Sequence, residues 1–315
     1  MIVLDEPYVS EPLIAWLEES QHPVLDNAFA RSIADGRALN LVSSDEAVRR
    51  IDAGERVYTN SENALAWIVE SAHNESLSRA IGLFKDKAAM RAALAGLDPD
   101  LFFKSCSVDE LFKLDFSQLP APFVLKPSVG FCSMGVYAIQ NREDWERALA
   151  DIQQNASSWH DMYPESVIGA GSFILEGYLE GTEYALDAYF DETGRAHILN
   201  VLRHDFTSPE DTSDRMYVTS ASIVRDTSTM FASWLDRVNA LIGARNFPVH
   251  VEVRVSDGHV SPSSSIRCGL RALAAPTSAG TATATAPTRR SSKTTSPTSM
   301  RRSTARPTRC TPCRC

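Results

Sequence analysis

The sequence predicts a protein of mixed α/β and α+β class with more than one domain, and three observations support this. The chain has 315 residues, more than a single compact domain commonly holds. Residues 1–72 alternate short apolar runs with amphipathic segments, which is typical of a small and parallel α/β layer. Between residues 101 and 255, apolar runs separated by turn residues predict further strands that pair as hairpins.

Composition indicates a soluble chain with two unlike parts. Hydrophobic residues make up 43% of the sequence, and no apolar run approaches the length of a membrane span or a secretory signal. Ten of the 31 basic residues and none of the 40 acidic residues follow residue 257, so residues 1–257 carry a net charge of −19. An acidic body argues against nucleic acid and membrane partners. Because only Cys106 and Cys132 of six cysteines lie in that body, we expect a cytoplasmic protein without a disulfide framework.

The first expected domain covers residues 1–74. Its strands are expected at residues 2–4, 23–25, 38–42 and 56–58. Its helices are expected to follow Ser10, Ser43 and Ser61, which are residue types that cap helices. The segment has no GxGxxG turn, so the sequence does not support a dinucleotide site there.

The second expected region covers residues 75–260. One helix is expected over residues 75–96, with Asp86 and Lys87 in its middle, and others over residues 142–153 and 230–243. The expected strands cover residues 101–104, 123–126, 135–139, 172–175, 184–190, 196–201 and 249–255. The second and third of these are expected to form a hairpin, the last alternates strictly, and residues 202–220 read as a polar loop.

A lysine and a small-residue turn suggest a phosphate site in the stretch FVLKPSVGFCSMGV, residues 123–136. Lys126 ends a buried apolar run, and Ser128, Gly130 and Gly135 follow in a turn where backbone N–H groups can approach a ligand closely. The stretch EGYLEGTE then places Glu176 seven residues before Glu183. Backbone groups of Tyr178 and Leu179 can read an adenine edge, and a carboxylate can accept both ribose hydroxyls; the alternative is a solvated acidic turn.

Taken in order, Asp86-Lys87, Lys126 with its turn, the Glu176–Glu183 segment and Glu252 resemble the ATP-grasp superfamily over residues 75–260. The resemblance implies a nucleotide held between two lobes, after a small Rossmann-like domain of the kind that precedes this fold. It implies ATP and Mg²⁺ as cofactors, and a small carboxylate and an amine as substrates. It also implies that Lys87 and Lys126 bind the phosphates, that Glu176, Tyr178, Leu179 and Glu183 bind the nucleoside, and that Glu252 is a magnesium ligand.

The sequence departs from that family after Asp257-Gly258, where members return on a strand bearing Glu-x-Asn. This chain reads HVSPSSSIRCGL there, and residues 261–315 form a basic, low-complexity tail rich in Thr, Ala, Arg, Ser and Pro. We interpret this tail as disordered or non-native and as the product of a reading-frame slip near Ser263, which the coding DNA would test. In that interpretation Cys310, Cys313 and Cys315 form no metal site, and the missing metal strand impairs the ligase.

Three functions stay open at this stage: an ATP-dependent carboxylate–amine ligase, a degenerate nucleotide-binding protein without catalysis, and an ATP-grasp kinase. In the polar loop, Arg215 is the best candidate for stabilising transition-state charge, with His204, Asp205 and Asp214 nearby in sequence. His250 and Arg254 share the strand face of Glu252 and can reach the cleft, although a paired histidine on a half-buried strand is an alternative for His250.

Overall fold

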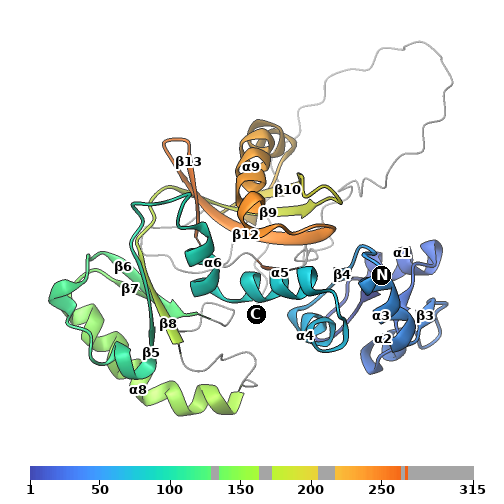
Figure 1. Ribbon diagram of the computed structural model, residues 1–315, viewed down its shortest axis with the longest axis horizontal. Coiled ribbons are helices and arrows are strands. Elements are labelled where there is room, and N and C mark those ends of the chain that lie inside the picture. Colours follow the sequence, from blue (N-terminus) through green and yellow to red (C-terminus); the bar gives the residue numbers. More distant parts are fainter. Residues whose placement is uncertain (129–134, 163–171, 205–216, 264–266, 269–315) are drawn as a thin grey trace, which may run out of the picture.

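The computed structural model of the chain describes residues 1–128, 135–162, 172–204, 217–263 and 267–268 (Figure 1). Gly130, Cys132, Asp205, Asp214 and Arg215 lie outside the described residues. Three sheets follow one another along the molecule, with the first and the second at opposite ends and the third between them. Within the described residues, no helix is both long and apolar enough to cross a membrane.

The first sheet has four strands in the order β3-β2-β1-β4, and all its pairs are parallel, as the alternating pattern predicts. Helix α2 is too short to show a clear period and was not predicted; Asn27 caps it by accepting the Ala30 N–H. The strands are β1 (Ile2–Val3), β2 (Val24–Leu25), β3 (Leu41–Val42) and β4 (Tyr58–Thr59). The helices are α1 (Glu11–Ser20), α2 (Ala28–Ile33), α3 (Ser44–Asp52) and α4 (Glu62–Ser71).

The second sheet is antiparallel, with the order β5-β8-β6-β7, and the predicted hairpin of β6 and β7 is confirmed. Its strands are β5 (Phe103–Ser107), β6 (Phe123–Pro127), β7 (Tyr137–Ile139) and β8 (Ser172–Gly177). Helix α8 (Arg142–Met162) covers it, and Trp145 packs edge-on against Phe123 with ring centroids 5.9 Å apart. The short helix α7 (Val108–Leu111) and a 3₁₀ turn (Phe116–Gln118) connect β5 to β6.

The third sheet is antiparallel, and its longest strand is β12 (Phe247–Ser256). Apolar and polar residues alternate along this strand. Val249, Val251 and Val253 are fully buried in the largest core cluster. Helices α9 (Ala221–Ile242) and α5 (Glu75–Lys85) cover that face, through the ring pairs Phe231–Tyr184 and Phe84–Phe247. The remaining strands are β9 (Thr182–Phe190), β10 (Ala196–His204), β11 (Tyr217–Val218), β13 (His259–Pro262) and β14 (Arg267–Cys268).

The prediction of one continuous helix over residues 75–96 was wrong. Asp86 has extended backbone angles and separates α5 from α6 (Lys87–Leu94). Its carboxylate accepts the N–H groups of Ala88 and Ala89 at 2.8 and 3.1 Å, because an aspartate caps a helix better than it continues one. Lys87 therefore stands at the first position of α6. The last helix also begins earlier than predicted, since α9 starts at Ala221 and not at residue 230.

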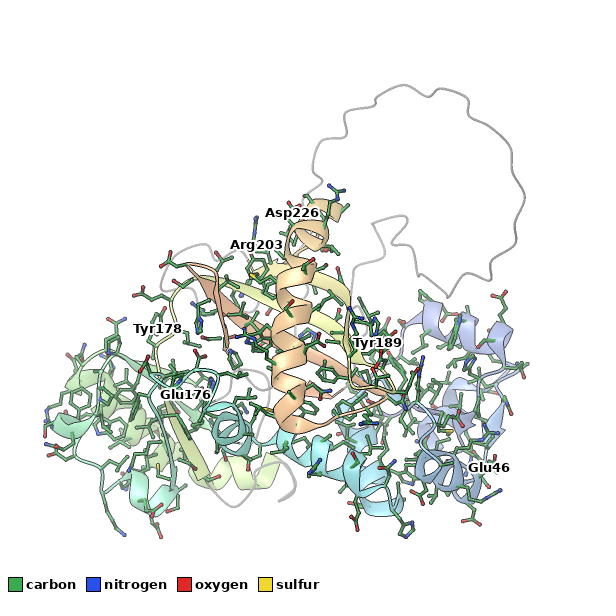
Figure 2. All side chains as sticks on the ribbon, turned by 45° about the horizontal axis from the view of Figure 1, so that its top comes forward. Glu46, Glu176, Tyr178, Tyr189, Arg203 and Asp226 are labelled. Atoms are coloured by element: carbon green, nitrogen blue, oxygen red, sulfur yellow. The ribbon has the colours of Figure 1, made fainter. Side chains whose placement is uncertain are left out.

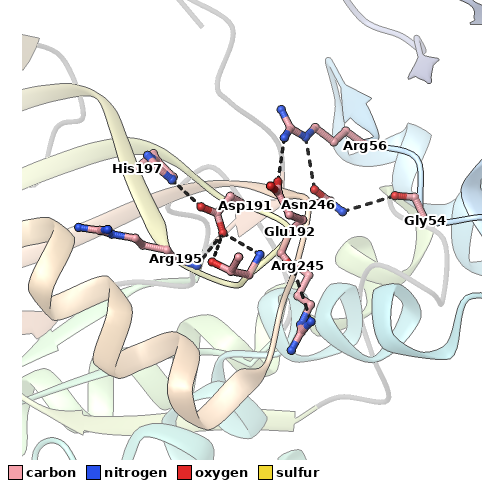
Figure 3. A network of polar contacts seen from close by, with 9 residues as sticks. Gly54, Arg56, Asp191, Glu192, Arg195, His197, Arg245 and Asn246 are labelled. Atoms are coloured by element: carbon pink, nitrogen blue, oxygen red, sulfur yellow. Dashed lines mark hydrogen bonds and ion pairs between the residues drawn. The ribbon is translucent and has the colours of Figure 1, made fainter.

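A polar network joins the first sheet to the turn that follows β9 (Figure 3). Arg56 donates to the Glu192 carboxylate at 3.0 Å and to the Asn246 side chain at 3.3 Å. Asn246 in turn donates to the Gly54 carbonyl at 3.4 Å. These contacts hold the segment that leads into β4 against the turn after β9 of the third sheet.

Candidate nucleotide site

Three charged side chains form a buried cluster where the second sheet meets α6. Lys126 and Arg91 both pair with the Glu176 carboxylate, Arg91 Nε at 2.6 Å from Oε1 and Lys126 Nζ on Oε2. All three side chains are at least nine-tenths buried, at 7%, 5% and 7% exposure for Lys126, Arg91 and Glu176. Burial raises the pKa of Glu176, but the charges of Lys126 and Arg91 outweigh that effect and hold the pKa below its usual value.

The cluster holds two cations and one anion, so it carries a net positive charge. Arg91 Nη1 is buried and has no hydrogen-bond partner among the described residues. A buried guanidinium nitrogen without a partner is costly unless an anion or a carbonyl meets it. This cluster can therefore accept a phosphate group. Sequence reasoning did not find Arg91, although its place four residues after Lys87 puts both on one face of α6.

The side chains of Arg91 and Lys126 also contact the chain at the end of β13, where the second sheet meets the third. Arg91 Nη2 donates to the Pro262 carbonyl at 2.8 Å, and Lys126 Nζ donates to the Ser263 carbonyl at 3.2 Å. Ser263 N–H donates to the Glu252 carbonyl at 3.0 Å. Lys126 and the Glu252 strand, predicted to face one gap, are thus connected through a single residue.

The two ends of the predicted phosphate turn are described, and one of them contacts α6. The Lys87 N–H donates to the Ser128 carbonyl at 2.9 Å, which places the start of α6 beside the segment that follows β6. Ser128 itself is bonded to Ser172 of β8 through both backbone and side chain. Gly135, at the other end, has φ +67, a left-handed conformation that favours glycine. Lys87 and Lys126 therefore come from elements that meet at Ser128.

The predicted nucleoside segment is tied to β12 through Arg254. Glu183 pairs with Arg254 at 2.9 Å and with His204 Nδ1 at 3.2 Å, so both of its carboxylate oxygens are engaged. Arg254 also donates to the Leu179 carbonyl at 3.2 Å and lies 6.0 Å from the centre of the Tyr178 ring. Figure 2 shows Glu176 and Tyr178 on the same side of the third sheet.

Gly181 explains how this segment lies so close to β12. Its φ is +105, and a Cβ there would stand 2.3 Å from the Val255 carbonyl oxygen. Only glycine permits that approach. Glu176 differs from the prediction in one respect, because its oxygens already bind Lys126 and Arg91; a direct contact with the nucleoside stays a prediction.

The described residues do not fit a complete magnesium site. Glu252 is half-buried on the polar face of β12, and the residue opposite it on the neighbouring chain segment is Ser263. The Ser263 hydroxyl is buried and has no partner among the described residues. Over the same residues, no group of three or more His, Cys, Asp or Glu side chains is placed to hold a metal ion. Mg²⁺ prefers several hard oxygen ligands, and one carboxylate supplies too few.

Residues 119–268 match the ATP-grasp domain family, and the sequence matches no curated protein. The structure resembles L-amino acid ligase from Bacillus licheniformis, with a TM-score of 0.62 and 17% identity, over 85% of this chain and 67% of the ligase.

Two further structures are similar. The ADP complex of N5-carboxyaminoimidazole ribonucleotide synthetase has a TM-score of 0.53 and 15% identity, over 84% of this chain and 68% of that protein. The biotin carboxylase domain of 2-oxoglutarate carboxylase from Hydrogenobacter thermophilus was solved with MgADP, ADP and bicarbonate. It has a TM-score of 0.53 and 13% identity, over 85% of this chain and 62% of that domain. At these identities the likeness concerns the fold alone.

Proposed function

Because the chain carries an ATP-grasp domain, we propose that it binds ATP between its second and third sheets, in the manner of ligases that join a carboxylate to an amine. The observation that carries this proposal is the buried cluster of Lys126, Arg91 and Glu176, which has a net positive charge and an unpartnered guanidinium nitrogen. The ligase, synthetase and carboxylase structures that share the fold support the same class of reaction. The chain spans 67%, 68% and 62% of those proteins, so its own substrates are part of the proposal.

The proposed chemistry has two steps. A carboxylate oxygen attacks the γ-phosphorus of ATP, the bond to the β-phosphate oxygen breaks, and an acyl phosphate and ADP form. An amine then attacks the acyl carbon, phosphate leaves, and the nitrogen loses a proton. Lys87 and Lys126 are proposed to neutralise phosphate charge in the first step, with Arg215 as a further candidate outside the described residues.

Tyr178, Leu179 and Glu183 are proposed to hold the nucleoside, and Ser128, Gly130 and Gly135 to flank the phosphates. Glu252 is the proposed magnesium ligand, and the absence of a carboxylate opposite it leads us to propose a chain impaired in catalysis. The second candidate function, a nucleotide-binding protein without turnover, is favoured by that same feature.

We expect the full chain to bind ATP in a calorimetric titration and to release ADP slowly or not at all. Binding without turnover would agree with a magnesium site in which Glu252 lies opposite Ser263 and no second carboxylate faces it. The ADP assay should be run with and without amino acids as amine acceptors. Robust ADP release that depends on the amine would contradict the proposed impairment, and release with a phosphorylated product alone would identify a kinase. Absence of ATP binding would overturn the proposed function.

Ser263→Glu is expected to tighten ATP binding in the presence of Mg²⁺. The new carboxylate would stand opposite Glu252 on the same strand face and supply a second oxygen ligand. We expect a gain of roughly tenfold in affinity, about 1.4 kcal/mol, that disappears when EDTA removes the metal. Ser256→Glu, at the exposed end of β12, is the matched control and should change nothing. Equal affinity of the two variants would contradict the placement of the metal site.

A further inference from the structure

Two side chains of the third sheet, His250 and Asp187, have no role in the proposed reaction so far. His250 of β12 and Asp187 of β9 are register partners, and His250 Nδ1 lies 2.8 Å from Asp187 Oδ1. Both side chains are more than nine-tenths buried, at 6% and 9% exposure. The other ring nitrogen, His250 Nε2, is buried and has no hydrogen-bond partner among the described residues. This nitrogen needs a partner that the described residues do not supply.

The bond to Asp187 decides what kind of partner that is. An ionised carboxylate only accepts hydrogen bonds, so Nδ1 carries the proton in the His250–Asp187 bond. With Nδ1 donating to Asp187, Nε2 is the lone-pair nitrogen of the neutral tautomer, and a donor is the group that complements it. Among small-molecule groups, an amine or a hydroxyl meets that requirement, while a carboxylate or a phosphate does not.

The position of the pair places this acceptor beside the candidate nucleotide site. His250 lies two residues before Glu252 on the same polar face of β12. The first sheet lies near this pair, because Val3 and Leu25 belong to the same core cluster as Ala188 and Val249, the strand neighbours of Asp187 and His250. Burial, with the Asp187 charge added, raises the pKa of Tyr58 of β4 to about 12.

The other polar residues of this face have partners of their own. Glu183 is paired with His204 and with Arg254. Glu183 lies four residues before Asp187 on β9, and Arg254 lies four residues after His250 on β12. Among the described residues none of that group bonds to His250 Nε2, and the two carboxylate–imidazole pairs are separate on the sheet. His250 Nε2 is therefore a buried acceptor on this face that no described residue occupies.

We propose that His250 Nε2 accepts a hydrogen bond from the amine of the second substrate, which makes His250 a specificity-determining residue for the amine. Asp187 acts through His250 as a positioning residue, because it fixes the ring and its tautomer. This inference rests on the proposed function, since it assigns a group of the amine substrate to a residue of the strand that carries Glu252.

The test is calorimetric and uses the full chain, without relying on turnover. Each of the common L-amino acids is titrated into the wild-type protein, with and without the non-hydrolysable nucleotide AMP-PNP. His250→Asn keeps a donor in the place of Nδ1 for Asp187 but removes the Nε2 acceptor, while His250→Gln places an amide oxygen near the Nε2 position. The carboxylic acid that lacks the amino group of the best-binding amino acid serves as the matched ligand.

We expect at least one amino acid to bind, His250→Asn to weaken that binding roughly tenfold or more, and His250→Gln to retain most of it. The acid without the amine should bind wild type and His250→Asn equally, and both proteins should bind AMP-PNP alike. Equal amino acid affinity in wild type and His250→Asn would overturn the inference, as would the lack of any amino acid binding to wild type. Loss of AMP-PNP binding by wild type would overturn the proposed function instead, and amino acid titrations without nucleotide would still report on His250.

Discussion

Replacing Glu176 with leucine is expected to lower the free energy of unfolding by about 3–5 kcal/mol, the largest effect on stability that we predict. The substitution leaves the charges of Lys126 and Arg91 buried without their common anion. Arg91 and Lys126 each have a further acceptor, the carbonyls of Pro262 and Ser263, but a carbonyl does not neutralise a cation. Urea denaturation followed by circular dichroism measures the change.

The matched control for this prediction is Glu143→Leu. Glu143 pairs with Arg147 on α8, and these side chains are 81% and 67% exposed. Removing that exposed pair should cost less than about 1 kcal/mol. A second variant that replaces Arg91, Glu176 and Lys126 together with apolar residues should recover part of the stability, because no uncompensated charge remains. A Glu176→Leu variant as stable as Glu143→Leu would show that the buried cluster is wrongly assigned.

The parts of the fold that the sequence predicted are those set by local periodicity and by chain order. Strict alternation over residues 249–255 predicted the strand β12 and its polar face, because side chains of a strand point alternately to its two sides. The turn-separated runs around Lys126 predicted the β6–β7 hairpin. The order of lysines and carboxylates suggested the ATP-grasp fold, which the family match and the similar structures confirm.

The features that were missed depend on residues far apart in the sequence. Arg91 was not predicted, and it pairs with Glu176, 85 residues later. His250 was a candidate and a paired histidine was the alternative, but its partner Asp187, 63 residues earlier, was not predicted. Neither pair leaves a local pattern, because sheet register and helix docking bring the side chains together only in the folded chain. The break at Asp86 was different, since an aspartate within a helical run is itself a capping signal that the apolar period concealed.

Sequence reasoning also treated Glu176 and Lys126 as two independent ligand contacts, and the structure joins them. Because of this ion pair, a nucleotide phosphate must either share Lys126 with Glu176 or take the place of the Glu176 carboxylate on Lys126. Arg91 can keep Glu176 neutralised while Lys126 turns to the ligand, because Arg91 holds the other carboxylate oxygen. The cluster therefore explains how a lysine can be both buried beside Glu176 and available to a phosphate.

Lys126→Met is accordingly expected to weaken ATP binding without unfolding the protein. Methionine fills a similar volume, and Glu176 keeps its bond to Arg91 at 2.6 Å, so the buried carboxylate stays compensated. A hydrogen bond to a charged group contributes about 1.5–3 kcal/mol, which corresponds to a loss of roughly 10- to 150-fold in affinity. Calorimetric titration with ATP and Mg²⁺ measures the loss, and circular dichroism verifies the fold.

Lys104→Met is the matched control, because Lys104 lies on β5 of the same sheet with an exposed side chain. That variant should bind ATP as wild type does, since an exposed lysine away from the cluster adds little to a phosphate contact. AMP, which lacks the β- and γ-phosphates, should bind Lys126→Met and wild type with nearly equal affinity if Lys126 acts on those phosphates. ATP affinity that is unchanged in Lys126→Met would remove the central contact of the proposed nucleotide site, and an equal loss for AMP and ATP would move Lys126 from the phosphates to the nucleoside.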